Sequence, residues 1–193
     1  GLILSNSGAV TANYWLSEIY DDEIANAHRN ADIHIHDLSM LTGYCAGWSL
    51  RQLIMEGLGG VCGKITSKPA KHLSSLCNQM VNFLGIMQNE WAGAQAFSSF
   101  DTYLAPFVKV DNLSYKEVKQ CIESFVFGVN TPSRWGTQAP FSNITLDWTI
   151  PSDLSDEHAI VGGKKQAFFY KDCKKEMDMI NKAFIRMNVP PSL

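Results

Sequence analysis

One segment of twenty residues holds the side chains best suited to chemistry. Its histidines, His34 and His36, are two positions apart; Asp37 follows, and Cys45 comes eight residues later. Isoleucines alternate with the histidines, which predicts a short β-strand over residues 32–38 with both imidazoles on one face. Cys45 lies in the run GYCAG, and flanking glycines indicate tight backbone around a thiol, although a buried inert cysteine is the ordinary interpretation.

Two imidazoles on the same face of a strand can hold a zinc or a similar ion. Metal-dependent hydrolases on barrel folds open with such a pair and then need further His and Asp ligands. Of the other histidines, His72 flanks an apolar helical stripe and His158 lies in a charged loop. A metal-dependent hydrolase using the pair His34 and His36 is therefore one alternative function.

A glycine-rich run at residues 57–64 resembles a phosphate-binding loop only superficially. Such a loop requires glycine five positions before Gly63 and serine or threonine after Lys64. Leu58 and Ile65 occupy those two positions. A structural turn is the better interpretation. Serine hydrolases are also disfavoured, because the sequence has no G-x-S-x-G run.

Composition limits the remaining classes. The 193 residues suffice for one sizeable domain or two small ones, and a net charge of -3 with scattered Lys and Arg gives no basic footprint for nucleic acid. The five cysteines show no C-x-x-C spacing, and no signal peptide or membrane-spanning apolar run is present. We therefore expect a protein of the reducing cytoplasm, with neither nucleic acid nor membrane as a partner.

Apolar periodicity predicts a helix-rich chain around these residues. A capping box of Ser114 with Glu117 begins one helix, and residues 151–165 are expected to form a polar loop. Alternation over residues 143–150 predicts a second strand with one polar face. The other predicted helices cover residues 11–28, 49–57, 69–91 and 92–110 (broken near Pro106), with a last helix after Asp172; Cys77 and Cys121 are expected in the core, and Cys173 exposed.

Four longer runs carry a resemblance that changes the reading of Cys45. They are HIHDL (34–38), LTGYCAGWSL (41–50), QNEWAGAQAF (88–97) and PSRWGTQAPFSN (132–143). Together, and in this order, they resemble the anaerobic (class III) ribonucleoside-triphosphate reductase family. The resemblance extends from about residue 13 to about residue 184.

The resemblance implies an α/β fold, namely part of the ten-stranded α/β barrel of the glycyl radical enzyme and ribonucleotide reductase type. In this family, a thiyl radical on a loop inside the barrel takes the ribose 3′ hydrogen, and the 2′ hydroxyl leaves as water. A second cysteine on the first barrel strand then supplies a hydrogen atom, with formate as the usual final reductant. Cys45 matches that second cysteine.

The same resemblance suggests substrate-binding residues. His36 and Asp37 would orient the substrate or fix the end of their strand. Gln138 and Ser142 precede the second predicted strand and Asn143 begins it, and these three residues would reach the ribose or the phosphates. No metal ligand is expected among them.

Several parts of the family pattern have no match in residues 1–193. These are the N-terminal ATP cone, the cysteine that becomes the thiyl radical, the C-terminal zinc site and the glycyl-radical segment. We therefore expect an N-terminal-to-middle part of the catalytic subunit, inactive alone. A non-catalytic remnant that binds nucleotides or dimerises is a further alternative.

The family also implies cofactors and partners for the whole protein. The glycyl radical is installed by an activating protein with a [4Fe-4S] cluster and S-adenosylmethionine, formate is a co-substrate, and the structural zinc lies outside this chain. Partners are the ribonucleoside triphosphate substrate, dNTP or ATP effectors and a second copy of the subunit. The helix over residues 69–91 resembles the dimer-forming region.

Overall fold

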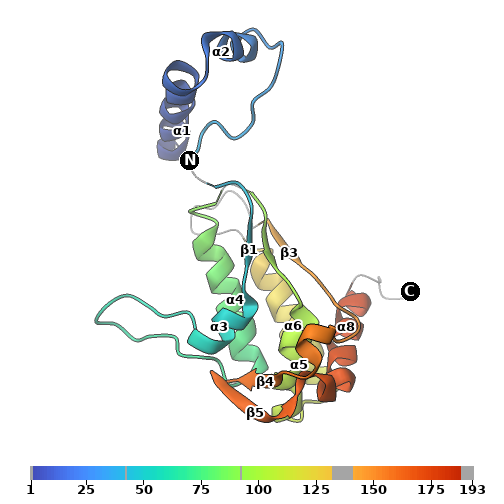
Figure 1. The fold of residues 1–193 in the computed structure, drawn as a ribbon. Helices are drawn as coiled ribbons and strands as arrows, with labels where there is room; N and C mark the ends of the chain where they lie inside the picture. Colours follow the sequence, from blue (N-terminus) through green and yellow to red (C-terminus); the bar gives the residue numbers. More distant parts are fainter. Residues whose placement is uncertain (1, 42, 92, 132–140, 188–193) are drawn as a thin grey trace, which may run out of the picture.

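The computed structural model describes residues 2–41, 43–91, 93–131 and 141–187, which form two N-terminal helices and a larger α/β body (Figure 1). The α-helices are α1 (Leu2–Tyr14), α2 (Asp22–Arg29), α3 (Leu50–Glu56), α4 (Leu73–Met87), α5 (Phe100–Val110), α6 (Tyr115–Val129), α7 (Ser152–Ser155) and α8 (Lys174–Met187). The strands are β1 (Ala46–Trp48), β2 (Gln95–Phe97), β3 (Ser142–Ile144), β4 (His158–Val161) and β5 (Lys164–Phe169); a π-helical turn (Trp15–Ile19) and a 3-10 turn (Tyr170–Cys173) complete the elements.

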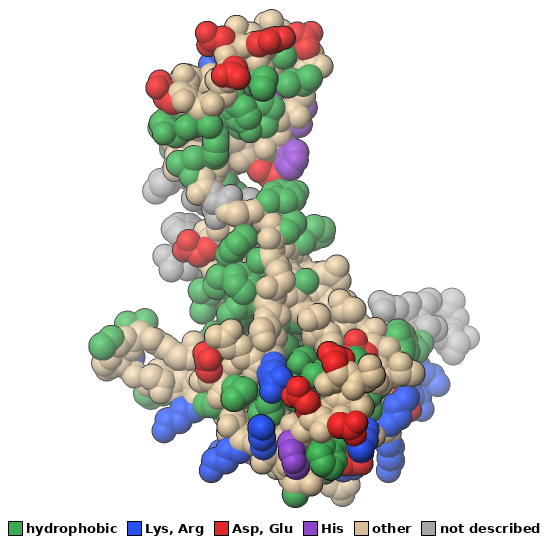
Figure 2. Space-filling model, in the orientation of Figure 1, with side chains coloured by type: hydrophobic (Ala, Val, Ile, Leu, Met, Phe, Trp, Pro, Cys, Tyr) green, Lys and Arg blue, Asp and Glu red, His purple; other side chains and the backbone are tan. Residues whose placement is uncertain are grey.

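The predicted helix over residues 11–28 is divided in the structure. The chain becomes extended at Tyr20, so α1 and its π-helical continuation are separated from α2. The following segment returns toward α1, where the Trp15 indole donates to the Met40 carbonyl at 2.9 Å. Acidic side chains gather at the far end of this part (Figure 2), and the first turn of α2 carries Asp22 and Glu23.

Three parallel strands in the order β1-β2-β3 organise the body. Parallel neighbours need crossover connections, and helices supply them: α3 and α4 between β1 and β2, α5 and α6 between β2 and β3. The register aligns Ala46 with Gln95 and Ser142. The expected α/β, helix-rich class is confirmed, and within the described residues these strands form an open sheet, not a closed barrel.

Helices α4, α5, α6 and α8 pack on one another to form the main core (Figure 1). The predicted stripe of α4 is buried, and the Phe100 ring lies 5.1 Å from Phe125 of α6 and 5.5 Å from Phe184 of α8. The side chains at the centre are fully buried and apolar: Leu73, Leu76, Met80, Leu84, Leu104, Phe107, Val118, Ile122, Met177 and Ile180.

Several local predictions are confirmed. The Ser114 hydroxyl accepts from the Glu117 amide while the Glu117 carboxylate accepts from the Ser114 amide, which is the predicted capping box of α6. Gly57 ends α3 with φ of 78°. Residues 57–68 form a projecting loop with an isolated bridge between Gly59 and Ser67, as expected for a structural turn. Cys77 is buried, and Cys121 packs against the core.

Other local predictions are wrong. Residues 92–110 contain β2 before α5, and α5 continues through Pro106 without a break. The expected polar loop over residues 151–165 instead contains α7 and the first part of the β4-β5 hairpin. Cys173 is 1% exposed because its 3-10 turn packs under α5, and this burial raises the pKa of its thiol to about 12.

A buried carboxylate joins the sheet to the helices. Asp101, at the start of α5, is fully buried, and its Oδ1 accepts from the backbone amides of Thr102 (3.0 Å) and Asp147 (2.9 Å). Its Oδ2 accepts from the Trp148 amide at 3.0 Å and from the Asn181 side chain at 2.8 Å. One side chain thus holds α5, the segment after β3 and α8 together.

No helix among the described residues is long and apolar enough to cross a membrane.

Replacing Asp101 with Asn should lower the free energy of unfolding by about 2–4 kcal/mol. The NH2 group of the new side chain would face N–H donors from which the carboxyl oxygen of Asp101 accepts hydrogen bonds. Urea unfolding followed by circular dichroism measures this. Asp178→Asn is the matched control, since Asp178 is 57% exposed and forms only a surface ion pair with Lys174. We expect that change to stay within about 0.5 kcal/mol. Equal effects of the two substitutions would contradict the role of Asp101.

Candidate active site

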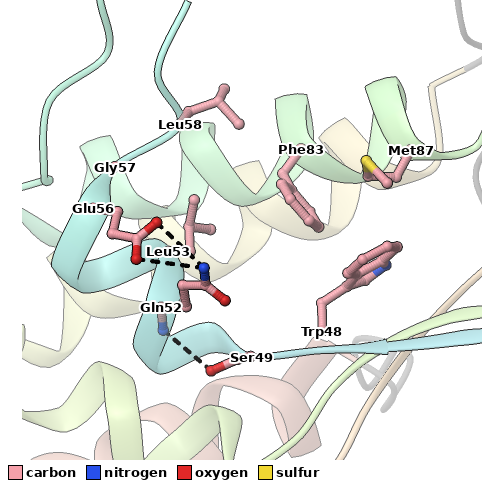
Figure 3. Close-up of a pocket in the computed structure, with 9 residues that line it drawn as sticks. All are labelled: Trp48, Ser49, Gln52, Leu53, Glu56, Gly57, Leu58, Phe83 and Met87. Atoms are coloured by element: carbon pink, nitrogen blue, oxygen red, sulfur yellow. Dashed lines mark hydrogen bonds between the residues drawn. The ribbon is translucent and has the colours of Figure 1, made fainter.

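The sheet has two unlike faces. Successive side chains of a strand alternate between faces, so the register places Trp48, Phe97 and Ile144 on one side. Helix α4 covers this side: the Trp48 ring lies 5.2 Å from that of Phe83, and both line a cavity of about 260 Å³ (Figure 3). The opposite face carries Gly47, Ala96 and Asn143, and α4 does not cover it. We call it the open face.

Cys45 lies directly before β1, two residues ahead of Gly47 on the open face. The cysteine is exposed and is not in a disulfide. Gly47 and Asn143 belong to the same face, because Gly47 aligns with Ala96 and Ala96 with Asn143. Of the predicted site residues, Asn143 thus lies on the open face, and Cys45 directly precedes the strand that carries Gly47 of that face.

The backbone around Cys45 is tightly packed, as its flanking glycines suggest. Gly93 donates its amide to the Tyr44 carbonyl, and Ala46 donates to the Ala94 carbonyl at 3.0 Å. A Cβ atom at Gly93 would lie 2.8 Å from the Cys45 sulfur and 2.7 Å from the Tyr44 oxygen. Only glycine fits here, so this position fixes how closely β1 and β2 approach beside the thiol.

An indole ring closes the other side of this segment. A Cβ atom at Gly43 would overlap the ring of Trp91, which itself lies 5.6 Å from the Trp48 ring at 86°. The Trp48 indole also donates to Gln95 Oε1 at 2.9 Å. The glycines and tryptophans of this motif therefore serve close packing, which positions the cysteine between them.

The predicted strand over residues 32–38 is irregular in the structure, and its two histidines have different neighbours. The His34 ring lies 5.6 Å from that of His28, whereas the His36 ring contacts that of Tyr44 at 5.3 Å. Asp37, with φ of 58°, pairs with His36 at 2.5 Å, and both side chains are solvent-exposed. Tyr44 directly precedes Cys45, so this ring contact brings the pair of His36 and Asp37 close to the segment that carries the cysteine.

The remaining predicted residues divide differently. Ser142 aligns with Ala46 and Gln95, so its side chain belongs to the helix-covered face and not to the face of Cys45. Gln138 lies outside the described residues. The predicted second strand begins at Ser142 and ends at Ile144, which leaves most of the expected polar strand irregular.

The geometry does not support the metal-dependent hydrolase. The pair His34 and His36 was expected to share one strand face, but no strand forms there. Within the described ranges, no group of three or more His, Cys, Asp or Glu side chains is arranged to hold a metal ion.

Sequence reasoning missed two polar residues that position the site. Gln95 is 1% exposed and anchors Trp48, but its strand was read as part of a helix. No local pattern in the sequence marks Asp101 as buried, because its partners lie far along the chain. A signal was present for the first, since Gln95 lies within one of the four family-like runs.

The comparisons with known proteins agree with this architecture. A family model described as anaerobic ribonucleoside-triphosphate reductase matches residues 1–189. A search of curated proteins found no match.

Solved structures match over nearly the whole chain. The anaerobic ribonucleotide reductase from Thermotoga maritima in complex with dATP and CTP matches with a TM-score of 0.72 and 21% identity, over 95% of this chain and 34% of that one. The same organism's enzyme with dATP bound in the specificity site matches with a TM-score of 0.71 and 20% identity, over 94% of this chain and 33% of that one. A further anaerobic ribonucleotide reductase matches with a TM-score of 0.70 and 21% identity, over 93% of this chain and 31% of that one. The chain thus spans about a third of the length of these proteins.

Replacing Gly93 with Ala should lower the free energy of unfolding by about 1–3 kcal/mol. The added methyl group would overlap the Tyr44 carbonyl and the Cys45 sulfur, so both would have to move away from residue 93. Gly47→Ala is the matched control, since a Cβ atom there meets nothing within 4 Å. Chemical denaturation of both variants gives the comparison. Equal stability of the two variants would show that Gly93 does not fix the approach of the strands.

Proposed function

Because the chain belongs to the anaerobic ribonucleoside-triphosphate reductase family, we propose that it forms the part of the catalytic subunit that presents the reductant-side thiol, Cys45. One observation carries this proposal. Cys45 is an exposed thiol directly before β1, two residues ahead of Gly47, which shares the open face of a parallel sheet with Asn143.

Cys45 acts as a hydrogen-atom donor in this proposal. The reaction begins when a thiyl radical elsewhere in the subunit removes the ribose 3′ hydrogen, after which the 2′ hydroxyl leaves as water. The sulfur–hydrogen bond of Cys45 then breaks as a carbon–hydrogen bond forms on the sugar radical. Formate then gives a hydrogen atom to the Cys45 thiyl radical, and the remaining carbon dioxide radical anion gives one electron, with a proton, to the sugar and leaves as carbon dioxide. The 3′ hydrogen returns from the thiol that had taken it, which restores the first thiyl radical.

The neighbours of Cys45 position it and the substrate. Gly93 and Trp91 restrict the backbone on both sides of the thiol. Asn143 offers an amide on the same face, which can donate to and accept from ribose hydroxyls. The pair of His36 and Asp37 contacts Tyr44, which directly precedes Cys45. We assign to this pair the role of orienting the segment before β1.

The chain alone does not enclose a substrate, because its described strands form an open sheet. We assign the thiyl-forming cysteine, the glycyl radical and the zinc site to other parts of the full subunit, since no run in this sequence matches them. The cluster-containing activating protein acts on that glycine.

Nucleotide effectors and a dimeric state follow from the same assignment. The Thermotoga maritima enzyme was solved with dATP and CTP, and with dATP in its specificity site. We extend both kinds of ligand to the full protein: a ribonucleoside triphosphate as substrate and dNTP or ATP as effectors.

The five cysteines are free thiols, which suits a reducing cytoplasm.

Replacing Cys45 with Ala in the full-length protein should reduce conversion of CTP to dCTP to background, because the variant lacks the thiol that donates the hydrogen atom in this proposal. Activated enzyme assayed under anaerobic conditions gives the rate. Cys62→Ser is the matched control: Cys62 is also exposed but lies on the projecting loop after α3, so its loss should leave the rate unchanged.

Retention of full turnover by the Cys45 variant would refute the assignment of the thiol. Nucleotide binding without turnover by the wild-type full-length protein would instead favour the non-catalytic alternative.

Formate dependence tests the reductant separately. Turnover by the wild-type protein should require formate and release carbon dioxide in proportion to dCTP. Dependence on a dithiol protein, with no carbon dioxide formed, would contradict formate as the reductant while leaving Cys45 in place.

A further inference from the structure

A second cavity lies on the open face of the sheet, at the carboxyl end of its strands. Its volume is about 380 Å³, and its lining includes the small residues Gly47 and Ala96. Ser98, Thr145 and Tyr103 add hydroxyl groups, and Trp48, Ser49 and Leu50 complete the lining. Ligands of parallel α/β sheets bind preferentially at this end of the strands.

The strand register connects this cavity to Cys45. The ladder continues beyond β3, since Thr145 donates to the Phe97 carbonyl at 2.9 Å and accepts from the Phe100 amide at 2.9 Å. Thr145 is therefore two residues past Asn143 and on the same face. Four residues separate the level of Cys45 from that of Thr145, which is about 13 Å at ~3.3 Å per residue.

We infer that this cavity receives the nucleobase of the ribonucleotide whose ribose lies at Cys45, with Thr145 and Tyr103 as its hydrogen-bonding residues. The inference rests on the proposed function, which places the ribose next to the thiol. A nucleoside laid along the strands then extends over the small residues Gly47 and Ala96 toward the hydroxyl groups.

The hydroxyl groups are available for such a ligand. Within the described part of the chain, no hydrogen bond occupies the side-chain oxygens of Ser98, Thr145 or Tyr103. A hydroxyl both donates and accepts, so it can pair with the carbonyl and the amino groups of different bases. The ring of Tyr103 is fixed edge-on against Tyr170, with centroids 5.6 Å apart at 90°.

The surrounding charges favour an uncharged group over a phosphate. The described residues that line the cavity include no Lys or Arg. Arg51, which is close enough to influence Tyr103, is paired with Glu157 at 3.0 Å, and Asp147 and Asp153 add negative charge nearby. Burial raises the pKa of Tyr103, so its hydroxyl keeps its proton in the neutral range.

The test measures binding of two ligands to the full-length protein. Equilibrium dialysis with CTP should show about fivefold to tenfold weaker binding for Thr145→Val and for Tyr103→Phe, since each loses one hydrogen bond. Ribose 5-triphosphate, which lacks a base, should bind equally to both variants and to the wild type. Thr149→Val is the matched control, because exposed Thr149 does not line the cavity.

The outcomes separate the inference from the function on which it rests. Unchanged CTP binding in both variants would overturn the inference, and so would an equal loss for CTP and ribose 5-triphosphate, which would place sugar or phosphate in the cavity. A base-dependent rise of KM with nearly constant kcat would support a positioning role. Failure of the wild-type protein to convert CTP to dCTP would overturn the proposed function instead, and the dialysis result is independent of it.

Discussion

The carboxylate of Asp101 is the constraint on which the rest of the body depends. It is fully buried, and its four donors come from three separate parts of the chain: the start of α5, the segment after β3 and helix α8. A polar group buried in such a place destabilises the fold unless its hydrogen-bond partners are present. Asp147 extends the same network by accepting from the Ser99 and Thr102 hydroxyls. Because this network holds the exit of β3, it also sets the shape of the open face beyond it.

The two faces of the sheet divide structure from chemistry. Large side chains such as Trp48 and Phe97 face the helices and provide the packing. The other face carries small or polar residues, namely Gly47, Ala96 and Asn143, and Cys45 directly precedes it in the chain. A surface of this kind is poor as a core but well suited to a bound nucleotide, because the small side chains leave room and the polar ones offer hydrogen bonds.

Sequence patterns predicted the features that depend on neighbouring residues. The Ser114 capping box, the buried stripe of α4 and the tight backbone at Cys45 all follow from local spacing. Features that depend on distant partners were not predictable in this way. Alternation at residues 32–38 suggested a strand, but alternation cannot supply a neighbouring strand to pair with. The donors of Asp101 include residues 46 and 80 positions away, which no local pattern reveals. The family resemblance was enough to identify Cys45 as a candidate site residue. The face of the sheet to which Ser142 belongs could be assigned only from the strand register.

The strand register also has a kinetic consequence. Both pairings of the sheet join residues nearly fifty positions apart, Ala46 with Gln95 and Gln95 with Ser142. Contacts of this separation have a high loop-closure entropy and form slowly, whereas the intervening helices need only local contacts. During synthesis on the ribosome, the residues of α3 and α4 are made before those of β2, so β1 has no neighbouring strand until that segment follows, and the sheet beside Cys45 is completed only after β3 has been made.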